Sequence, residues 1–229
     1  MKFKNPFKDL TKFEFALWFS SVVVVTASFL IPHDRDYLTL IASLIGVTAL
    51  IFCSKGYALG QMLIIAFAVF YGIISFHFKY YGEVITYLGM SAPMAVIALI
   101  SWLRHPYKST KEVEVNRMSK RQVLLMLLIT SVVTVAFYFI LKAFETANLV
   151  FSAISVATSF LAVYMTFMRS PYYAVGYALN DIVLIVLWIM AALENPSYIP
   201  MILCFIMFLI NDIYGFVNWL KMEKKQHNI

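Results

Sequence analysis

Two stretches near the end of the chain decide the fold: residues 173–192, YAVGYALNDIVLIVLWIMAA, and residues 198–220, YIPMILCFIMFLINDIYGFVNWL. Each is apolar over the roughly 20 residues that a helix needs to cross a bilayer, yet each holds an Asn-Asp pair. The pairs are Asn180-Asp181 and Asn211-Asp212. Because a charged group in hydrocarbon costs at least ~2.5 kcal/mol, such residues usually face a bundle interior or a water-filled path. The two stretches therefore predict membrane helices that carry a polar site, and transport is the first functional hypothesis.

The composition is that of a membrane protein. Of 229 residues, 62% are hydrophobic and 13% are charged, which is far from the usual mixture in soluble proteins. Eight apolar segments are long enough to span a bilayer, and little of the chain is left for a domain outside it. These segments lie near residues 14–31, 37–54, 57–78, 83–103, 121–141, 147–168, 172–192 and 198–220. The expected fold class is an all-α membrane protein with eight transmembrane helices.

The formal charge of +6 is explained by topology. With both termini in the cytoplasm, cytoplasmic segments hold 15 of the 18 lysines and arginines, and only Arg35, Lys79 and Lys142 lie outside. This imbalance is the one described by the positive-inside rule, so it predicts the orientation and makes a nucleic-acid partner unnecessary. The one sizeable polar stretch, residues 104–121, is expected to be a solvated linker.

A weak internal repeat divides the chain into two halves. YALG at residues 57–60 returns as YAVG at 173–176, and Trp102 returns as Trp219, at offsets of 116 and 117 residues. Four crossings separate equivalent positions, so the halves run in the same direction, an arrangement in which substrate sits between halves that rock or gate. The expected organisation is an extra N-terminal helix at 1–36, a three-helix bundle at 37–103, a linker and linking helix at 104–145, and a second three-helix bundle with the C-terminal tail at 146–229. Both tryptophans are expected to anchor the membrane interface.

The predicted site is asymmetric between the halves. Ile64-Ile65 and Met94-Ala95 stand where the second half has its Asn-Asp pairs. At 1.5 Å per residue, Asp181 lies ~16 Å and Asp212 ~21 Å from the outer loop, near one membrane level. The candidate substrate-binding residues are Gln61, Tyr177, Asn180, Asp181, Trp188, Asn211, Asp212 and Tyr214.

Neither a cofactor nor a metal site is expected. Cys53 and Cys204 lie within apolar spans without paired spacing, and the chain has no phosphate-cradling glycine loop that would indicate ATP as an energy source. An intramembrane enzyme with Asp181 and Asp212 as an acid-base pair is the alternative from another class, but no further catalytic motif accompanies them. The chain is expected not to be an enzyme.

Residues 211–219, NDIYGFVNW, resemble the aromatic ending of the PnuC family of bacterial nicotinamide riboside transporters. Related features are KGY at 55–57, YGIISF at 71–76 and YGE at 81–83, so the resemblance covers about residues 37–221 and omits the first helix. The first half ends in APM at 92–94 followed by Trp102, and lacks the IYG motif that some members repeat there.

The resemblance implies a SWEET-like fold, in which two parallel three-helix bundles are joined by one linking helix (3+1+3), assembled as a homotrimer in the bacterial inner (plasma) membrane. It also implies facilitated diffusion of nicotinamide riboside through alternating access, with intracellular phosphorylation trapping the product. Relatives that prefer thiamine or riboflavin keep these two vitamins as alternatives.

Nicotinamide riboside fits the candidate residues chemically. Its pyridinium ring is a flat cation that an aromatic face and a carboxylate attract, here Trp188 and Asp181. Amide side chains such as Asn180 and Asn211 suit its carboxamide and ribose hydroxyl groups. No lysine or arginine lies in the middle of a span, which argues against a phosphorylated substrate.

The charge imbalance generates a prediction about topology. In a background with Cys53 and Cys204 replaced, cysteines introduced at Lys111 and Lys224 should resist an impermeant thiol reagent in intact cells. A cysteine at Asn195, in the last outer loop, should react. Labelling at position 111 from outside the cell would overturn the orientation.

Overall fold

The computed structural model describes residues 5–30, 37–77 and 81–227, and nearly all of them are helical. The helices are α1 (Lys12–Leu30), α2 (Tyr37–Ser54), α3 (Ala58–His77), α4 (Tyr81–Val84), α5 (Ala92–Arg104), α6 (Lys120–Ala143), α7 (Leu149–Phe167), α8 (Tyr173–Glu194) and α9 (Ile199–His227). Short 3₁₀ helices at Pro6–Asp9 and Pro196–Tyr198 precede α1 and α9. Within the described residues, eight spans are long and apolar enough to cross a membrane, so the predicted all-α membrane fold with eight transmembrane helices is confirmed.

The fourth span is the one that departs from a regular helix. Between α4 and α5, residues Ile85–Ser91 form a π-helix, in which the N–H of Ala92 bonds to the carbonyl of Tyr87, five residues back. Pro93 explains the wider turn, because it has no N–H to give to the carbonyl four residues before it. The sequence predicted a continuous helix over 83–103, and the structure replaces it with a helix that widens before Pro93.

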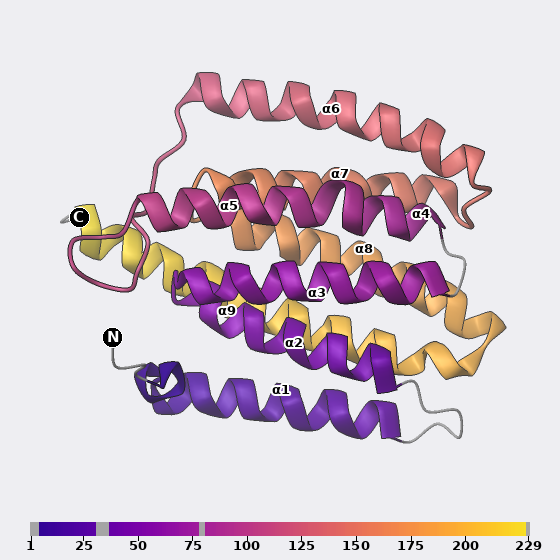
Figure 1. Cartoon of the computed structure of the whole chain (residues 1–229), viewed down its shortest axis with the longest axis horizontal. Helices are drawn as coiled ribbons and strands as arrows, with labels where there is room; N and C mark the ends of the chain where they lie inside the picture. Colours follow the sequence, from indigo (N-terminus) through magenta and orange to yellow (C-terminus); the bar gives the residue numbers. More distant parts are fainter. Residues whose placement is uncertain (1–4, 31–36, 78–80, 228–229) are drawn as a thin grey trace.

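Six helices form a closed ring. In packing order they are α2, α3, α5, α7, α8 and α9, and α9 returns to α2. Outside the ring, α1 packs against α2 and α9, while α6 packs against α7 at the opposite side of the molecule (Figure 1). This order, with each set of three helices contiguous, is the one expected of two parallel three-helix bundles. The 3+1+3 repeat itself stays a prediction.

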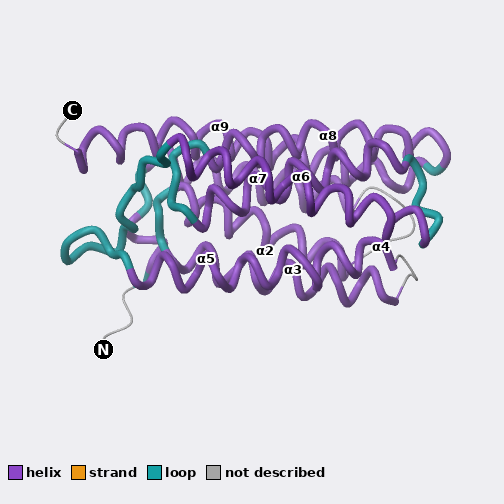
Figure 2. The backbone as a smooth tube through the Cα atoms, turned by 90° about the horizontal axis from the view of Figure 1, so that it is seen from above, coloured by secondary structure: helices purple, strands orange, loops and turns teal. Residues whose placement is uncertain are grey.

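The helices run side by side, with the connecting loops gathered at the two ends (Figure 2). The start of α1, the end of α9 and the loop of residues 105–119 lie at one end, which we call the linker end (Figure 1). Ion pairs at this end join Lys111 to Asp9 and Arg117 to Glu223. Of the basic residues used to predict topology, those at positions 2, 4, 35 and 79 fall outside the described residues.

The linker is tied to the helix ends. Val113 and Val115 are each 2% exposed, the N–H of Val115 donates to Gln226 Oε1 at 2.7 Å, and Gln226 Nε2 donates to the carbonyl of Val113 at 3.1 Å. The expectation of a fully solvated linker was therefore wrong for these residues. Their apolar side chains are buried because the last turns of α9 extend beyond the bundle and offer them a surface.

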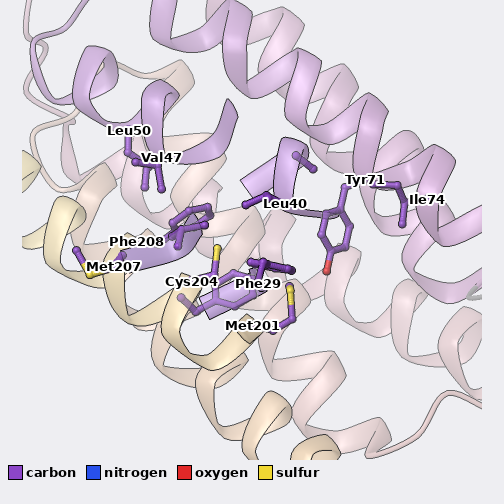
Figure 3. Close-up of a cluster of buried hydrophobic side chains, with 13 residues drawn as sticks. Phe29, Leu40, Val47, Leu50, Tyr71, Ile74, Met201, Cys204, Met207 and Phe208 are labelled. Carbon is purple, nitrogen blue, oxygen red and sulfur yellow. The ribbon is translucent and has the colours of Figure 1, made fainter. Parts of the chain in front are cut away.

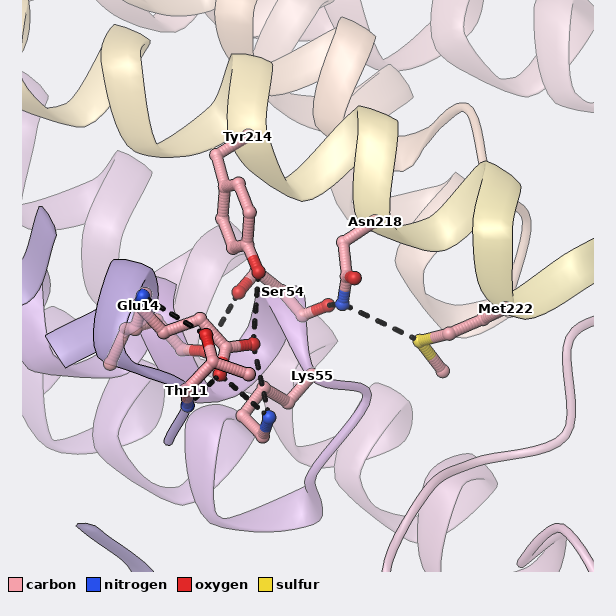
Figure 4. Close-up of polar contacts among 8 residues, drawn as sticks. Thr11, Glu14, Ser54, Lys55, Tyr214, Asn218 and Met222 are labelled. Atoms are coloured by element: carbon pink, nitrogen blue, oxygen red, sulfur yellow. Dashed lines mark hydrogen bonds and ion pairs between the residues drawn. The ribbon is translucent and has the colours of Figure 1, made fainter. Parts of the chain in front are cut away.

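Polar contacts fasten the extra helix α1. Thr11 and Glu14 form a reciprocal pair of hydrogen bonds that starts the helix. The Glu14 carboxylate, 2% exposed, also accepts from Lys55 Nζ of the α2–α3 turn at 2.9 Å and from the Tyr214 hydroxyl of α9 at 2.9 Å (Figure 4). Because a buried carboxylate needs such partners, α1 has one favoured position on the ring.

An apolar core fills the contact between α1, α2, α3 and α9 (Figure 3). Phe29, Val47, Tyr71 and Phe208 contribute from these four helices, and all four are buried. In a membrane such packing rests on close contact rather than on exclusion of water, so small residues at helix crossings matter.

Gly60 and Gly176, the glycines of the repeated motif, sit at such crossings. A Cβ on Gly60 would lie 2.5 Å from the backbone nitrogen of Cys53 on α2, and one on Gly176 would lie 2.8 Å from Ala162 Cα on α7. Both obstacles are backbone atoms, which move only if a helix moves. The repeated glycines therefore allow α3 to approach α2 and α8 to approach α7.

This close approach predicts that Gly176→Ala destabilises the protein by ~1–3 kcal/mol, because the added methyl group forces α8 away from α7. Thermal unfolding in detergent would measure the loss. Gly215→Ala is the matched control, since its Cβ would meet nothing nearer than 3.5 Å and should be tolerated. Equal losses in the two variants would contradict the proposed role of close packing at Gly176.

Candidate functional site

The ring of six helices encloses a cavity of about 90 Å³. Every helix of the ring contributes to its lining. The lining residues are Gly46, Leu50, Ile64, Phe67, Ala68, Tyr87, Ser91, Ala95, Ser159, Val163, Tyr177, Asn180, Asp181, Leu184, Phe205, Phe208 and Asp212. The volume suits several water molecules, so a larger ligand would enter only if side chains or helices moved apart.

Two carboxyl groups meet in this cavity. Asp181 on α8 and Asp212 on α9 are 4% and 3% exposed, and their side chains lie within hydrogen-bonding reach of each other. Within the described residues, Asp181 Oδ2 has no hydrogen-bond partner. Two adjacent carboxylates repel each other, and a buried acceptor without a partner is costly, so a cationic or hydrogen-bond-donating ligand would relieve both effects.

Aromatic rings line the cavity beside the carboxyl groups. Tyr177 lies one helical turn before Asp181, and Phe67, Tyr87, Phe205 and Phe208 line other parts of the wall. The Phe67 ring meets Tyr87 and Phe208 edge to face, with centroids 6.1 and 6.2 Å apart. These faces can accept a flat cation.

Two tryptophans lie at the linker end of the cavity. Trp102 and Trp219 follow the lining residues Ala95 and Asp212 by seven residues each, about two helical turns. Their rings lie 5.4 Å apart, and they are 2% and 0% exposed. The expectation that they anchor the membrane interface was therefore wrong.

Each tryptophan crosses from its own half of the chain to the other. Trp102 Nε1 donates to the carbonyl of Thr166 on α7, and Trp219 Nε1 donates to the carbonyl of Cys53 on α2, both at 2.9 Å. The rings of Tyr173 and Trp219 meet edge to face, with centroids 4.8 Å apart. Together Trp102, Tyr173 and Trp219 form a buried cluster of rings on the linker side of the cavity, which we call the aromatic floor.

Four of the eight predicted site residues line the cavity: Tyr177, Asn180, Asp181 and Asp212. Gln61 does not, and its amide nitrogen lies 3.4 Å from Cys53 Sγ between α2 and α3. Trp188 packs against Tyr198 near the far end of α8, with ring centroids 5.5 Å apart.

Asn211 and Tyr214 face α1 instead of the cavity. Asn211 Nδ2 donates to Ser21 Oγ at 2.9 Å, and the Tyr214 hydroxyl donates to Glu14. Tyr214 and Glu14 line a second, more open cavity of about 650 Å³ between α1 and α9 at the linker end. The sequence repeat excluded the first helix, so it gave no means of knowing which face of α9 that helix covers.

Sequence reasoning missed the contributions of the first half to the cavity. Phe67 looks like ordinary apolar filling, and Tyr87 and Ser91 belong to the π-helix. The one available signal was Pro93, because a proline within a membrane span indicates a distorted helix, and such distortions cluster at functional sites.

No group of three potential metal ligands occurs in the described part of the chain. Among the described residues that line the cavity, none is a lysine or an arginine. The polar groups available to a ligand are therefore carboxyl, amide and hydroxyl groups, which suit cations and uncharged hydrogen-bonding groups better than phosphate.

Comparison with known proteins agrees with the predicted transporter. A family model described as nicotinamide mononucleotide transporter matches residues 36–221. A nicotinamide riboside transporter PnuC from Neisseria mucosa is 25% identical over 227 residues, which cover 97% of this chain and 86% of the relative. A crystal structure of the vitamin B3 transporter PnuC superimposes with a TM-score of 0.81 at 24% identity, covering 95% of this chain and 94% of the other. The resemblance read from residues 37–221 is confirmed, and so is the choice of transporter over enzyme.

Proposed function

The chain belongs to the nicotinamide mononucleotide transporter family, and we propose that it imports nicotinamide riboside by facilitated diffusion. The observation that carries the choice of substrate is the pair of buried carboxyl groups, Asp181 and Asp212, in a cavity with aromatic walls. Nicotinamide riboside combines a permanently cationic flat ring with a carboxamide and ribose hydroxyl groups. The cavity offers a partner for each of these.

The proposed binding residues are those that line the cavity. Asp181 attracts the pyridinium ring and Tyr177, one turn away, offers it an aromatic face. Asp212 accepts hydrogen bonds from ribose hydroxyl groups, and Asn180 binds the carboxamide. The named relative from Neisseria mucosa, a nicotinamide riboside transporter, supports this choice of ligand.

The charge of the cavity favours the riboside over the mononucleotide. A phosphate would enter a site with two carboxyl groups, and among the described lining residues no basic side chain offsets its charge. Burying such an unpaired charge costs several kcal/mol. Thiamine is also a cation and remains the main alternative, and riboflavin is a weaker one because it carries no positive charge.

Alternating access is the proposed mode of transport. The cavity of about 90 Å³ must widen to hold a nucleoside, and the aromatic floor must part to open the linker end. Movement of the α2–α3–α5 set against the α7–α8–α9 set would do both, because the two tryptophan hydrogen bonds run between these sets. Intracellular phosphorylation of the product would then keep transport directed inward.

The proposed setting is the bacterial inner membrane, with both termini and the linker end in the cytoplasm. The concentration of basic residues at the linker end supports this orientation. We also propose a homotrimer, as the family resemblance implies.

The cavity carboxylate gives a direct test. Asp181→Asn keeps the shape of the side chain and removes its charge, so it should weaken nicotinamide riboside binding by ~1–3 kcal/mol in calorimetric titration. Tyr214→Phe is the control, because Tyr214 lies in the other cavity and its loss should leave affinity unchanged. Unchanged affinity in a folded Asp181→Asn protein would mean that the carboxylate serves helix packing and that the ligand is held elsewhere.

Transport itself can be measured in liposomes that contain only the purified protein. Nicotinamide riboside should equilibrate in either direction without ATP, sodium or a proton gradient, and the mononucleotide should not compete. Accumulation above the outside concentration without a trapping kinase would contradict facilitated diffusion. Preference for thiamine or riboflavin in the same assay would change the assigned substrate.

A further inference from the structure

Asn180 is held by two hydroxyl groups of the neighbouring helix. Ser155 Oγ and Thr158 Oγ1, three residues apart on one face of α7, both lie against Asn180 Oδ1 on α8, at 3.1 and 2.9 Å. Asn180 is 6% exposed and lines the cavity beside Asp181. Neither Ser155 nor Thr158 lines the cavity, so their effect on a ligand would pass through the Asn180 amide.

Both hydroxyl groups engage the oxygen end of the amide. With the oxygen engaged by α7, the amide nitrogen is the end left for the cavity, and within the described residues it has no hydrogen-bond partner. An amide side chain that is not held can turn over about its last torsion angle, because the two orientations differ little in intrinsic energy. Turned over, Asn180 would add a third acceptor beside the two carboxyl groups.

Ser155 and Thr158 differ in the number of acceptors within reach of the hydroxyl proton. The Ser155 hydroxyl has Asn180 as its one acceptor among the described residues. The single Thr158 proton is also within reach of the carbonyls of Ile154 at 3.0 Å and Ser155 at 3.1 Å. The hydrogen bond from Ser155 to Asn180 therefore has no competing acceptor among the described residues, whereas the hydrogen bond from Thr158 has two.

We propose that Ser155 and Thr158 are positioning residues that hold the Asn180 amide nitrogen toward the cavity, so that the site recognises a carbonyl oxygen on a cationic ligand. The proposal rests on the proposed function and specifies how that site would recognise the carboxamide group of the ligand. An N–H donor beside two carboxyl groups selects a ligand that carries both a positive charge and an acceptor. The carboxamide of a pyridinium ring supplies the acceptor next to the charge.

Among the described residues that line the cavity, Asn180 is the one amide side chain. Ile64, which stands at the position equivalent to Asn180 in the first half, lines the cavity with an apolar side chain. A ligand that needs the amide donor would therefore bind in one orientation, with its carboxamide toward α7 and α8.

The test compares two cations on full-length purified protein by calorimetric titration. One is nicotinamide riboside, and the other is the riboside of unsubstituted pyridine, which keeps the charge and the sugar but lacks the carboxamide. The wild-type protein should prefer nicotinamide riboside, and the ratio of the two affinities measures recognition of the carboxamide. A variant with Ser155→Ala and Thr158→Val together should lose about two- to tenfold of this ratio, the range expected for one neutral hydrogen bond.

Matched variants separate positioning from general damage. Ser155→Ala alone should lower the ratio in part, and Thr158→Ser, which keeps the hydroxyl group, should retain it. Ser152→Ala is the control on the same helix, since its hydroxyl group bonds to the carbonyl of Ala147 and should not matter. In an Asn180→Ala background the double substitution should change the ratio no further, because the residue it acts through is gone.

The outcomes distinguish this inference from the proposed function. Equal weakening of both cations by the double variant, with the ratio unchanged, would overturn the positioning role and leave nicotinamide riboside transport intact. If the double variant does not fold, equal weakening of both cations by Ser155→Ala alone would likewise overturn the positioning role. A wild-type protein that binds neither pyridinium riboside but binds thiamine would overturn the proposed substrate itself.

Discussion

The constraint on which the structure depends is that a polar group inside a membrane must find its partner within the protein. Most of the described polar groups meet it, among them the Trp102 and Trp219 indoles, which donate to carbonyls near the helix ends of the opposite half. Buried Glu14 has three partners. A few buried side-chain atoms of the described residues lack a partner, among them Thr134 Oγ1, Asn211 Oδ1 and Asp181 Oδ2. Of the atoms without a partner, Asp181 Oδ2 is the one that belongs to a residue lining the cavity, where a ligand could supply what the protein does not.

The repeat predicted from the sequence pairs positions whose side chains differ between the two halves. Ala95 and Asp212 occupy equivalent positions and both line the cavity, yet one is inert and the other acidic. The first half contributes aromatic and small side chains and a π-helix before Pro93, where the second half contributes carboxyl and amide groups on regular helices. The carboxyl and amide groups of the cavity therefore all come from α8 and α9, while aromatic rings come from both halves.

The extra helix α1 covers one polar face of α9. Its polar contacts with Asn211 and Tyr214 occupy side chains that the sequence alone placed in the binding site. The same helix face would be free in a bundle without α1. Intramembrane polar residues therefore divide into two groups here: those that join helices, such as Glu14 and Asn211, and those that face the cavity, such as Asp181.

From the sequence alone it was possible to predict the membrane class and the eight spans and to locate two carboxyl groups, Asp181 and Asp212, within them, because length, hydropathy and the cost of buried charge depend on local composition. The sequence could not decide the direction in which each polar side chain points once α1 and the linker are added. Gln61, Trp188, Asn211 and Tyr214 have suitable chemistry but lie outside the cavity, while Phe67 lines it without any distinguishing local pattern. Only the tertiary structure decided these positions, since a side chain's partner on a helix is set by whichever neighbour covers that face, and neighbours come from distant parts of the chain.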